Sequence, residues 1–314
     1  MVGKLSDDRL MSGSRIPVLY SWLIAKEGHP YSTPNDELRR SIAANHGEYV
    51  REKSHIEPAY CGDLFEEPIA LDVCDVLNLP DPTLSPSVFG ADDGSWQCSM
   101  DALVHVDLPM IIFSDDTVCI EGDVSSIAID GPIPIEVKTT EAHFDGKTPL
   151  YRGPVQLQMQ MMAVNAKFGI LATVHRGNFR HYKIVKCDPV MQQQIGDLCL
   201  DFRDRVSEER YYPPVNVDDC TKTHAGGNPD PIELHSLSDD VERLVGLRQE
   251  VKDIEGEIER LQTKIMSEMQ DHESAQIGNY TVKWPRRHYK SQPEKVTPAK
   301  DARTIRLKGL QIKV

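Results

Sequence analysis

Long apolar runs, paired cysteines and spaced histidines are all missing from this sequence of 314 residues. No run approaches the roughly 18 apolar residues that a membrane-spanning helix needs, and residues 1–15 lack the apolar core of a secretory signal peptide. The seven cysteines are scattered without a CxxC pair, which is typical of reduced thiols and argues against a disulfide framework or an iron–sulfur cluster. The eleven histidines show no HxxxH or similar spacing, so a zinc site is not expected. We therefore expect a cytoplasmic protein without a membrane partner.

The net charge of −14 is unusual for a protein that binds nucleic acid, but it is unevenly distributed. Residues 283–314 hold ten lysines and arginines against Glu294 and Asp301, a net of +8, which leaves −22 for the first 282 residues. Binding depends on local patches more than on total charge, so the acidity counts only mildly against DNA binding. The mixed aromatic and basic segment Trp284–Tyr289 is either a solvated end or a nucleic-acid contact.

Composition divides the chain into four parts, and the apolar fraction of 39% is enough for a packed core. Residues 1–212 are expected to form the main domain. Residues 213–235 are rich in proline and contain two adjacent glycines, which is the composition of a linker. A helical or coiled-coil segment is expected over 236–272, and a short strand with a basic tail over 273–314.

Apolar residues recur in steps of three and four along the helical segment, as in a heptad repeat. They are Leu244, Leu247, Val251, Ile254, Ile258, Leu261 and Ile265. This seam suits a coiled coil or a docked helix hairpin. Because an exposed stripe of that length is costly in water, we expect it to pack within the chain or against a subunit.

Capping residues and periodicity predict the elements of the main domain. Thr33 and Pro34 mark a helix start, a second helix runs through Leu64–Leu77, and Asp188 caps a later one. A helix over Val155–Phe168 is expected to end at Gly169 as its C′ residue. Strands are expected over Cys98–Val106, Met110–Phe113, Val118–Ile120, Ile133–Thr139, Ile170–His175 and Phe179–Val185, the last two joined by a turn at residues 176–178.

The candidate chemistry lies in the segment Ile133–Lys138, which alternates with period two. Its apolar residues fall on one face of a strand, whereas Glu136 and Lys138 fall on the other, about 6.6 Å apart. A carboxylate and an ammonium in this arrangement can share a hydrated metal ion, the acid as ligand and the lysine next to the attacking water. Asp101 begins another strand, and if the two strands are neighbours it reaches the same metal. Mg²⁺ favours such a site.

Each of these signals has a structural explanation when taken alone. Glu136 and Lys138 can be an exposed ion pair on a sheet face, and Asp101 can be a turn residue. Ser14 can cap a helix that begins near Ile16, and Gln156, Gln158 and Gln160 can be solvated helix residues.

Four short blocks, taken in order, resemble the YqaJ-type viral recombinase family, the group within the PD-(D/E)XK nucleases that includes the lambda exonuclease. The blocks are Met11–Pro17 (MSGSRIP), Gly62–Ala70 (GDLFEEPIA), Ser99–Asp101 with Glu136–Lys138, and Gln156–Met161 (QLQMQM) with the later His181–Lys183. The resemblance covers about residues 9–210. It implies an α/β (α+β) fold with a restriction-endonuclease-like core, a central mixed sheet flanked by helices, and a C-terminal helical appendage.

The resemblance also implies roles for individual residues. Asp101 and Glu136 would bind Mg²⁺, for which Mn²⁺ can substitute, together with the Val137 carbonyl, while Lys138 would activate water. A glutamate of the upstream helix would complete the site, and we favour Glu66 over Glu67. Contacts to DNA would come from Ser14, Arg15, Ser99 and Gln156.

The implied activity is a 5′ to 3′ exonuclease on duplex DNA ends that leaves a 3′ strand for recombination. A single-strand annealing protein would be its partner, the chain would form a homo-oligomer, and the setting would be the cytoplasm of a bacterial or phage-infected cell. Two alternatives stay open: a RecB-like or endonucleolytic enzyme of repair or defence, and an inactive DNA-binding or assembly protein.

The sequence departs from the family pattern in three places. Ala102 follows the aspartate where the family usually has glycine. The gap between Asp101 and Glu136 is long, which predicts an added β-hairpin around Met110–Ile120. The arginine usually found upstream of the serine motif has no clear counterpart, because Arg9 lies closer to Ser14 than expected. This departure affects the expected recognition of a 5′ end more than the expected metal site.

Overall fold

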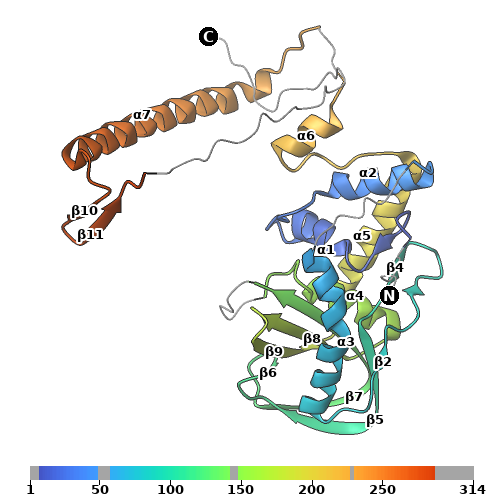
Figure 1. Ribbon diagram of the computed structural model, residues 1–314. Coiled ribbons are helices and arrows are strands. Elements are labelled where there is room, and N and C mark those ends of the chain that lie inside the picture. Colours follow the sequence, from blue (N-terminus) through green and yellow to red (C-terminus); the bar gives the residue numbers. More distant parts are fainter. Residues whose placement is uncertain (1–6, 49–56, 142–147, 227–229, 287–314) are drawn as a thin grey trace, which may run out of the picture. The chain divides into compact units, whose positions relative to one another are not determined.

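A computed structural model describes residues 7–48, 57–141, 148–226 and 230–286, with the side chains of 57–63 left out of the description. The chain forms two compact units, Met1–Thr223 (unit 1) and His224–Val314 (unit 2), and each is described here by itself (Figure 1).

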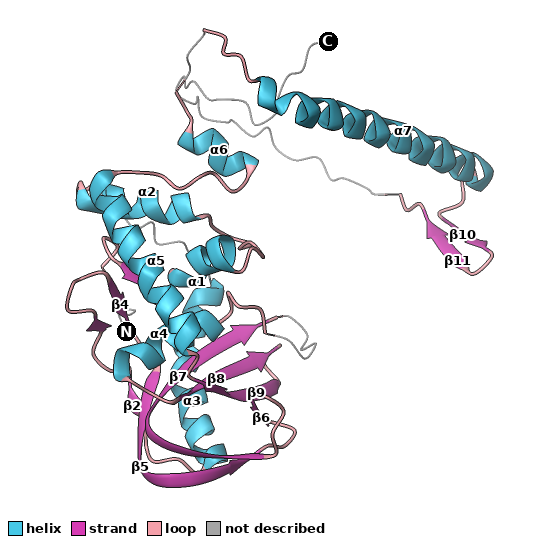
Figure 2. Ribbon diagram, turned by 180° about the vertical axis from the view of Figure 1, so that it is seen from behind, coloured by secondary structure: helices cyan, strands magenta, loops and turns pink. Residues whose placement is uncertain are grey.

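Unit 1 is built on a six-stranded mixed sheet with the order β2-β5-β7-β8-β9-β6 (Figure 2). The strands are β2 (Thr83–Leu84), β5 (Ala102–Phe113), β7 (Ser126–Thr140), β8 (Phe168–His175), β9 (Phe179–Lys186) and β6 (Val118–Ile120). The β7/β8 and β6/β9 pairs are parallel, and the remaining pairs are antiparallel. The expected central mixed sheet flanked by helices is confirmed.

Period-two alternation in β7 separates a core face from a polar face. Ile133, Ile135 and Val137 are buried in a cluster with residues of α3 (Glu57–Leu77), which lies across the sheet in Figure 1. On the opposite face α4 (Pro154–Val164) packs through Leu157 and Met161. Glu136 therefore points towards α4 rather than into the apolar core.

A second layer surrounds α4. It contains α1 (Ile16–Leu19), the π-helical turn η1 (Tyr20–Ile24), α2 (Pro34–Asn45), α5 (Pro189–Glu208) and a small sheet of order β1-β4-β3, with β1 at Met11–Ser12, β4 at Trp96–Cys98 and β3 at Phe89–Gly90. The predicted caps are present: Thr33 and Asp36 form a capping box on α2, and Asp188 accepts from two amides of α5. The predicted turn at residues 176–178 joins β8 to β9.

Two local expectations differ from the structure. Helix α4 ends at Asn165, which takes the left-handed conformation, so Gly169 is not its cap but lies inside β8. A Cβ on Gly169 would lie 2.8 Å from Leu157 Cδ1, so the glycine permits close packing of strand on helix. The expected added hairpin around Met110–Ile120 does not form either: residues 110–113 pair with 126–129, and β6 crosses to pair with β9.

The expected linker over 213–235 begins later than predicted. Helix α6 (Val217–Thr223) belongs to unit 1, because its Asp219 is fully buried and accepts a hydrogen bond from Asn35 Nδ2 at 3.0 Å. Asn35 also exchanges hydrogen bonds with the backbone of Tyr212. A polar network that composition does not reveal fixes this segment to α2.

Unit 2 contains the predicted long helix, α7 (Ser238–Met269), preceded by a 3₁₀ turn at His235–Leu237. The predicted strand is β11 (Tyr280–Lys283), and it forms a hairpin with β10 (Ser274–Ile277), which was not predicted. Much of the apolar seam is open to solvent; Val251 and Ile254 are 53% and 58% exposed. The expected burial of the seam within the chain is therefore not met among the described residues. The basic tail beyond Arg286 lies outside them.

In the part of the chain that the structure describes, no helix is both long and apolar enough to cross a membrane.

Candidate active site

The polar face of β7 holds two ionisable side chains together. Glu136 is 1% exposed, and one of its oxygens accepts from the Lys138 ammonium while the other accepts from Gln160 Nε2 at 2.6 Å. Lys138 Nζ donates to Gln156 Oε1 at 3.1 Å, and its side chain remains 33% exposed. The pair is therefore neither a free surface ion pair nor a fully enclosed one: the acid is buried, while part of the Lys138 side chain stays exposed.

Strand pairing brings Asp101 to this place. Strand β5 begins at Ala102, which lies opposite Ile135, so Asp101 is next to Glu136 just before the pairing starts. Asp101 Oδ2 accepts from the backbone N–H of Val137 at 2.8 Å. Because the N–H and C=O of one strand residue point to the same side, the Val137 carbonyl is directed towards Asp101 as well. The structure thus joins Asp101, Glu136, Val137 and Lys138, as the sequence predicted.

Electrostatic shifts follow from this geometry. Burial of Glu136 and the nearby charge of Asp101 raise the pKa of Glu136 to about 7, although Lys138 opposes the shift. Burial by itself lowers the pKa of Lys138, but the carboxylates of Glu136, Asp101 and Glu66 outweigh it and raise the pKa above its usual value. Lys138 is consequently protonated at neutral pH, while two carboxylates crowd a poorly solvated place that a cation would relieve.

Helix α3 contributes the remaining acid. Glu66 is partly buried, and its charge acts on Lys138, whereas Glu67 is exposed. Partial burial and this electrostatic effect favour Glu66 as the residue to test first.

One site residue was missed. Gln160 is fully buried and donates both to Glu136 and, at 2.9 Å, to the carbonyl of Ser99. Its spacing of four from Gln156 was the available signal, because residues four apart share a helix face. Gln158 lies elsewhere and bonds the Lys186 carbonyl and the Asp188 amide. The explanation of these glutamines as solvated residues is wrong for 158 and 160.

The proposed DNA contacts separate into two groups. Ser99 and Gln156 are partly exposed beside the catalytic strand, and Ser14 is exposed. Ser14 does not cap α1, because the N-cap position is held by Arg15, whose side chain makes no capping hydrogen bond. The Ser14 hydroxyl lies 3.3 Å from the Ser12 hydroxyl. Arg15 does not fit a DNA contact. It is 4% exposed, and its guanidinium is engaged with Glu37 and neighbouring carbonyls, so this part of the prediction is corrected.

The donor set suits a hard divalent cation. Among the described residues no group of three or more His, Cys, Asp or Glu side chains is arranged to hold one ion. Mg²⁺ does not need such a group, because it binds through one or two carboxylates and takes its other ligands from water and phosphate. Asp101 and Glu136, with the Val137 carbonyl, provide a set of that size.

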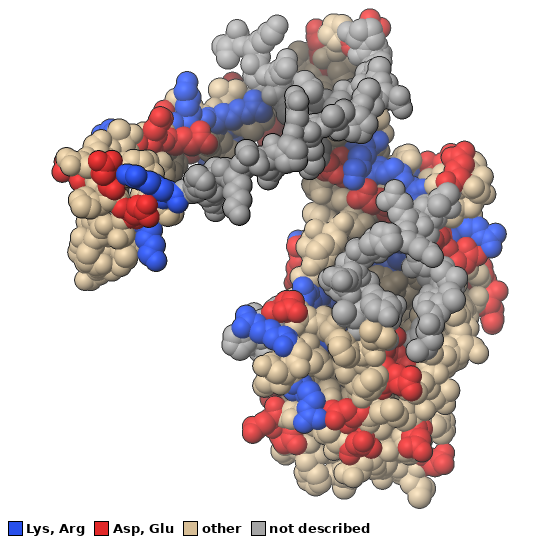
Figure 3. Space-filling view, viewed as in Figure 1, with Lys and Arg blue, Asp and Glu red and all other residues tan. Residues whose placement is uncertain are grey.

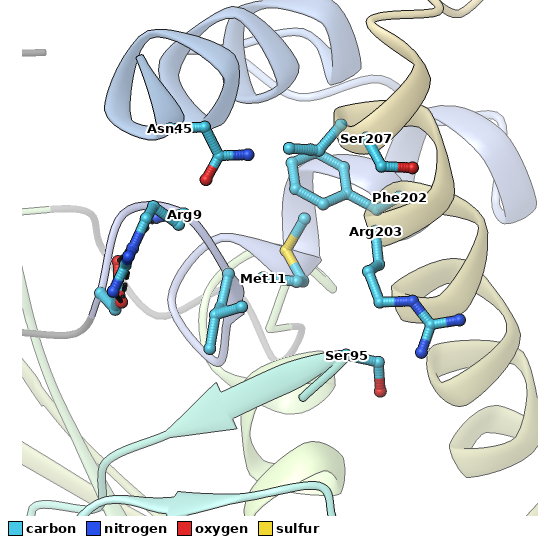
Figure 4. Close-up of a pocket in the computed structure, with 10 residues that line it drawn as sticks. Arg9, Met11, Asn45, Ser95, Phe202, Arg203 and Ser207 are labelled. Atoms are coloured by element: carbon cyan, nitrogen blue, oxygen red, sulfur yellow. Dashed lines mark hydrogen bonds and ion pairs between the residues drawn. The ribbon is translucent and has the colours of Figure 1, made fainter. Parts of the chain in front are cut away.

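A separate cavity of about 320 Å³ lies between β1, α2 and α5. Figure 4 shows Met11 and Phe202 lying between Arg9 and Arg203 in this cavity. Arg9 is paired with Asp7, and Arg203 with Asp93 and Asp204. None of the candidate catalytic side chains lines the cavity, so it is not the catalytic site.

Surface charge follows the acidic composition. On the face seen in Figure 3, acidic and basic side chains are interspersed rather than gathered into one basic surface. Any contact with nucleic acid on that face therefore depends on local groups.

No protein-family model matches the chain, and no curated protein matches it either. Among solved structures it is similar to an alkaline exonuclease (LHK-Exo) from Laribacter hongkongensis, at TM-score 0.43 and 11% identity over 65% of this chain and 90% of that one. The complex of LHK-Exo with dAMP gives TM-score 0.41 and 12% identity over 64% and 89%. A candidate exonuclease from Eubacterium rectale gives TM-score 0.41 and 12% identity over 74% and 94%.

TM-scores below 0.5 leave the chemistry of this chain to be judged from its own site. That site consists of a buried Glu136 and an ordered Lys138 on one strand, beside Asp101 at the start of the next, in a central mixed sheet flanked by helices.

Proposed function

We propose that this chain is a metal-dependent deoxyribonuclease of the PD-(D/E)XK type, which hydrolyses phosphodiester bonds of DNA. The observation that supports it best is the joining of Asp101 to the strand of Glu136 and Lys138 through the Val137 amide. A structural ion pair needs only Glu136 and Lys138. The second carboxylate, Asp101, makes the burial of Glu136 more costly, so a purely structural ion pair does not explain its presence.

Each residue has a role in this chemistry. Asp101, Glu136 and the Val137 carbonyl would hold Mg²⁺, with Glu66 nearby, and Mn²⁺ would be an adequate substitute. When bound, the ion stabilises negative charge on the phosphate and makes water a better nucleophile. Lys138, whose ammonium donates to Glu136 Oε1 and Gln156 Oε1, would hold and activate the attacking water.

Gln156 and Gln160 position these groups. Gln160 holds one oxygen of Glu136 and Gln156 holds the ammonium of Lys138, so both side chains are ordered before substrate arrives. Ordered groups spend less free energy on reorganisation during the reaction.

The finer proposal is an exonuclease that degrades duplex DNA ends 5′ to 3′ and leaves a 3′ strand for recombination with an annealing protein. It rests on the four sequence blocks. Cytoplasmic location and a homo-oligomer belong to the same proposal.

The test is hydrolysis of linear and circular duplex DNA by the full chain, with Mg²⁺ and with EDTA. Glu136→Gln and Lys138→Met are expected to lower kcat by at least about 100-fold, since they remove a metal ligand and a transition-state donor. Glu208→Gln and Lys167→Met, which change exposed residues outside the site, serve as matched controls.

Three outcomes would contradict this proposal. Cleavage of circular and linear DNA at equal rates supports an endonuclease. Binding of DNA without cleavage supports the inactive DNA-binding alternative. Near wild-type cleavage by Glu136→Gln refutes the assignment of the site.

A further inference from the structure

An aromatic cluster lies one step beyond the catalytic residues along β7. Residues 136, 138 and 140 alternate onto the same face, so Thr140 follows Lys138 at a distance of roughly 6.6 Å along the strand. The guanidinium of Arg152 donates a hydrogen bond to Thr140 Oγ1. Arg152 stands just before α4, the helix whose Gln156 holds Lys138. The catalytic groups and Arg152 therefore share one face and one supporting helix.

Three rings lie together next to Arg152 through Tyr151, and we call His29, Tyr31 and Tyr151 the aromatic cluster. The His29 ring centroid lies 5.4 Å from that of Tyr151 and 5.8 Å from that of Tyr31, with interplanar angles of 74° and 78°. Tyr31 and Tyr151 are 6.4 Å apart at 83°. The Arg152 Cζ lies 5.8 Å from the Tyr151 centroid. All three ring pairs are edge-to-face, an arrangement that fixes ring orientation.

Exposure of Tyr31 distinguishes this cluster from ordinary core packing. Tyr31 is 76% exposed although two neighbouring rings hold it in place. A ring that served only to anchor its loop would bury more of its surface, because burial is what makes an aromatic side chain stabilising. An oriented, accessible ring whose neighbour Tyr151 lies next to a guanidinium suits a ligand that is flat and carries negative charge near its flat part.

We propose that the aromatic cluster binds an unpaired nucleobase of the substrate strand, with the base stacked on Tyr31 and Arg152 facing a neighbouring phosphate. This inference rests on the proposed nuclease function. Every base has a π-face, so stacking on an aromatic ring tolerates any sequence, and a nearby arginine adds attraction for the backbone. The cluster would hold a nucleotide next to the one whose phosphodiester lies at Lys138.

His29 acts as a support. Burial lowers the pKa of His29, so its imidazole is neutral at pH 7, and the positive charge at the cluster comes from Arg152. Its Nδ1 accepts from the Tyr31 amide at 3.3 Å, which holds the loop in place below the exposed ring.

The experiment measures binding separately from catalysis. A fluorescently labelled single-stranded oligonucleotide is titrated with the full chain in EDTA, and its anisotropy is followed. Tyr31→Leu keeps an apolar side chain but removes the π-face, and it is expected to weaken binding by about 5- to 150-fold, the range for loss of one stacked base. Tyr31→Phe keeps the π-face and is expected to bind like the wild type.

Tyr280→Leu is the matched control, because Tyr280 is 78% exposed and belongs to unit 2. It is expected to leave binding unchanged.

A second measurement leaves the protein intact. Oligonucleotides that carry one abasic site at successive positions are expected to lose affinity for the wild type mainly at one position. Tyr31→Leu is expected to be insensitive to the abasic site at that position, since the contact is already absent.

The outcomes separate the two proposals. If the wild type hydrolyses DNA but Tyr31→Leu binds as tightly, or the abasic series is flat, the nucleobase site is refuted and the nuclease stands. Absence of wild-type binding to the oligonucleotide refutes the nucleobase site as well. If the wild type neither binds nor hydrolyses any DNA, both the nucleobase site and the nuclease function are refuted.

Discussion

Replacing Arg15 by methionine is expected to destabilise the protein severely, because every donor of this guanidinium is used inside unit 1. The group has five N–H bonds. They reach Glu37 Oε2 at 2.6 Å, the Glu37 carbonyl at 2.7 Å, Ser41 Oγ at 2.9 Å and the carbonyls of Leu10 and Asp8 at 2.9 and 3.0 Å. No donor is left for a phosphate of DNA.

The magnitude follows from burial. The side chains of Arg15 and Glu37 are 4% and 11% exposed, so removing the arginine leaves a carboxylate with poor access to water. Breaking a buried pair on one side costs about 3–5 kcal/mol, a large share of the 5–15 kcal/mol that holds a typical domain together. Arg15→Lys keeps the charge with at most three donors and is expected to fall between the wild type and Arg15→Met.

Urea unfolding of the full chain, followed by circular dichroism, measures the free energy of unfolding. The control is Arg9→Met, because Arg9 is 60% exposed and its solvent-screened pair with Asp7 should contribute little to stability. In Arg15→Met with Glu37→Met, the loss is expected to be smaller than the sum of the two single losses.

The opposite result would show that Arg15 contacts DNA. In that case Arg15→Met would retain wild-type unfolding while DNA affinity falls and the salt dependence of binding becomes shallower.

Three further changes test other features of the fold and the site. Gly169→Ala is expected to cost about 1–3 kcal/mol by overpacking against α4, whereas Gly196→Ala, at an open helical position, should stabilise by about 0.5–1 kcal/mol; equal melting temperatures would contradict this. Ser14→Ala should weaken any preference for 5′-phosphorylated ends without changing thermal stability, since Ser14 caps no helix; a melting shift with unchanged preference would reverse that assignment. Val251→Asp with Ile258→Asp should reduce the assembly mass in size-exclusion chromatography if the seam of α7 joins subunits, and an unchanged mass would show that it does not.

Local sequence patterns were sufficient to predict the features of the fold that depend on a few neighbouring residues. The alternation of residues 133–138 separates Glu136 and Lys138 from the core, because successive side chains of a strand point to opposite faces. Thr33 and Asp188 begin their helices through bonds to amides two or three residues away, and residues 176–178 turn one strand into the next. These features depend on local backbone geometry and on side-chain bonds within a few residues, so the sequence by itself determined them.

Contacts between distant segments were decided only in the folded chain. Register between β5 and β7 carries Asp101 to the Val137 amide, 36 residues away. The packing of α4 on β7 brings Gln160 to Glu136, and the approach of α2 to the N-terminal segment encloses Arg15. A polar residue looks the same in sequence whether it faces solvent or a buried partner, because its partner is fixed by packing rather than by spacing.

The error at the end of α4 has the same origin. Glycine is a common helix terminator, yet Asn165 ends this helix, and Gly169 is needed where strand and helix approach closely. The sequence places a glycine after this helix, and only the tertiary packing shows that its role is steric room for Leu157 rather than backbone freedom.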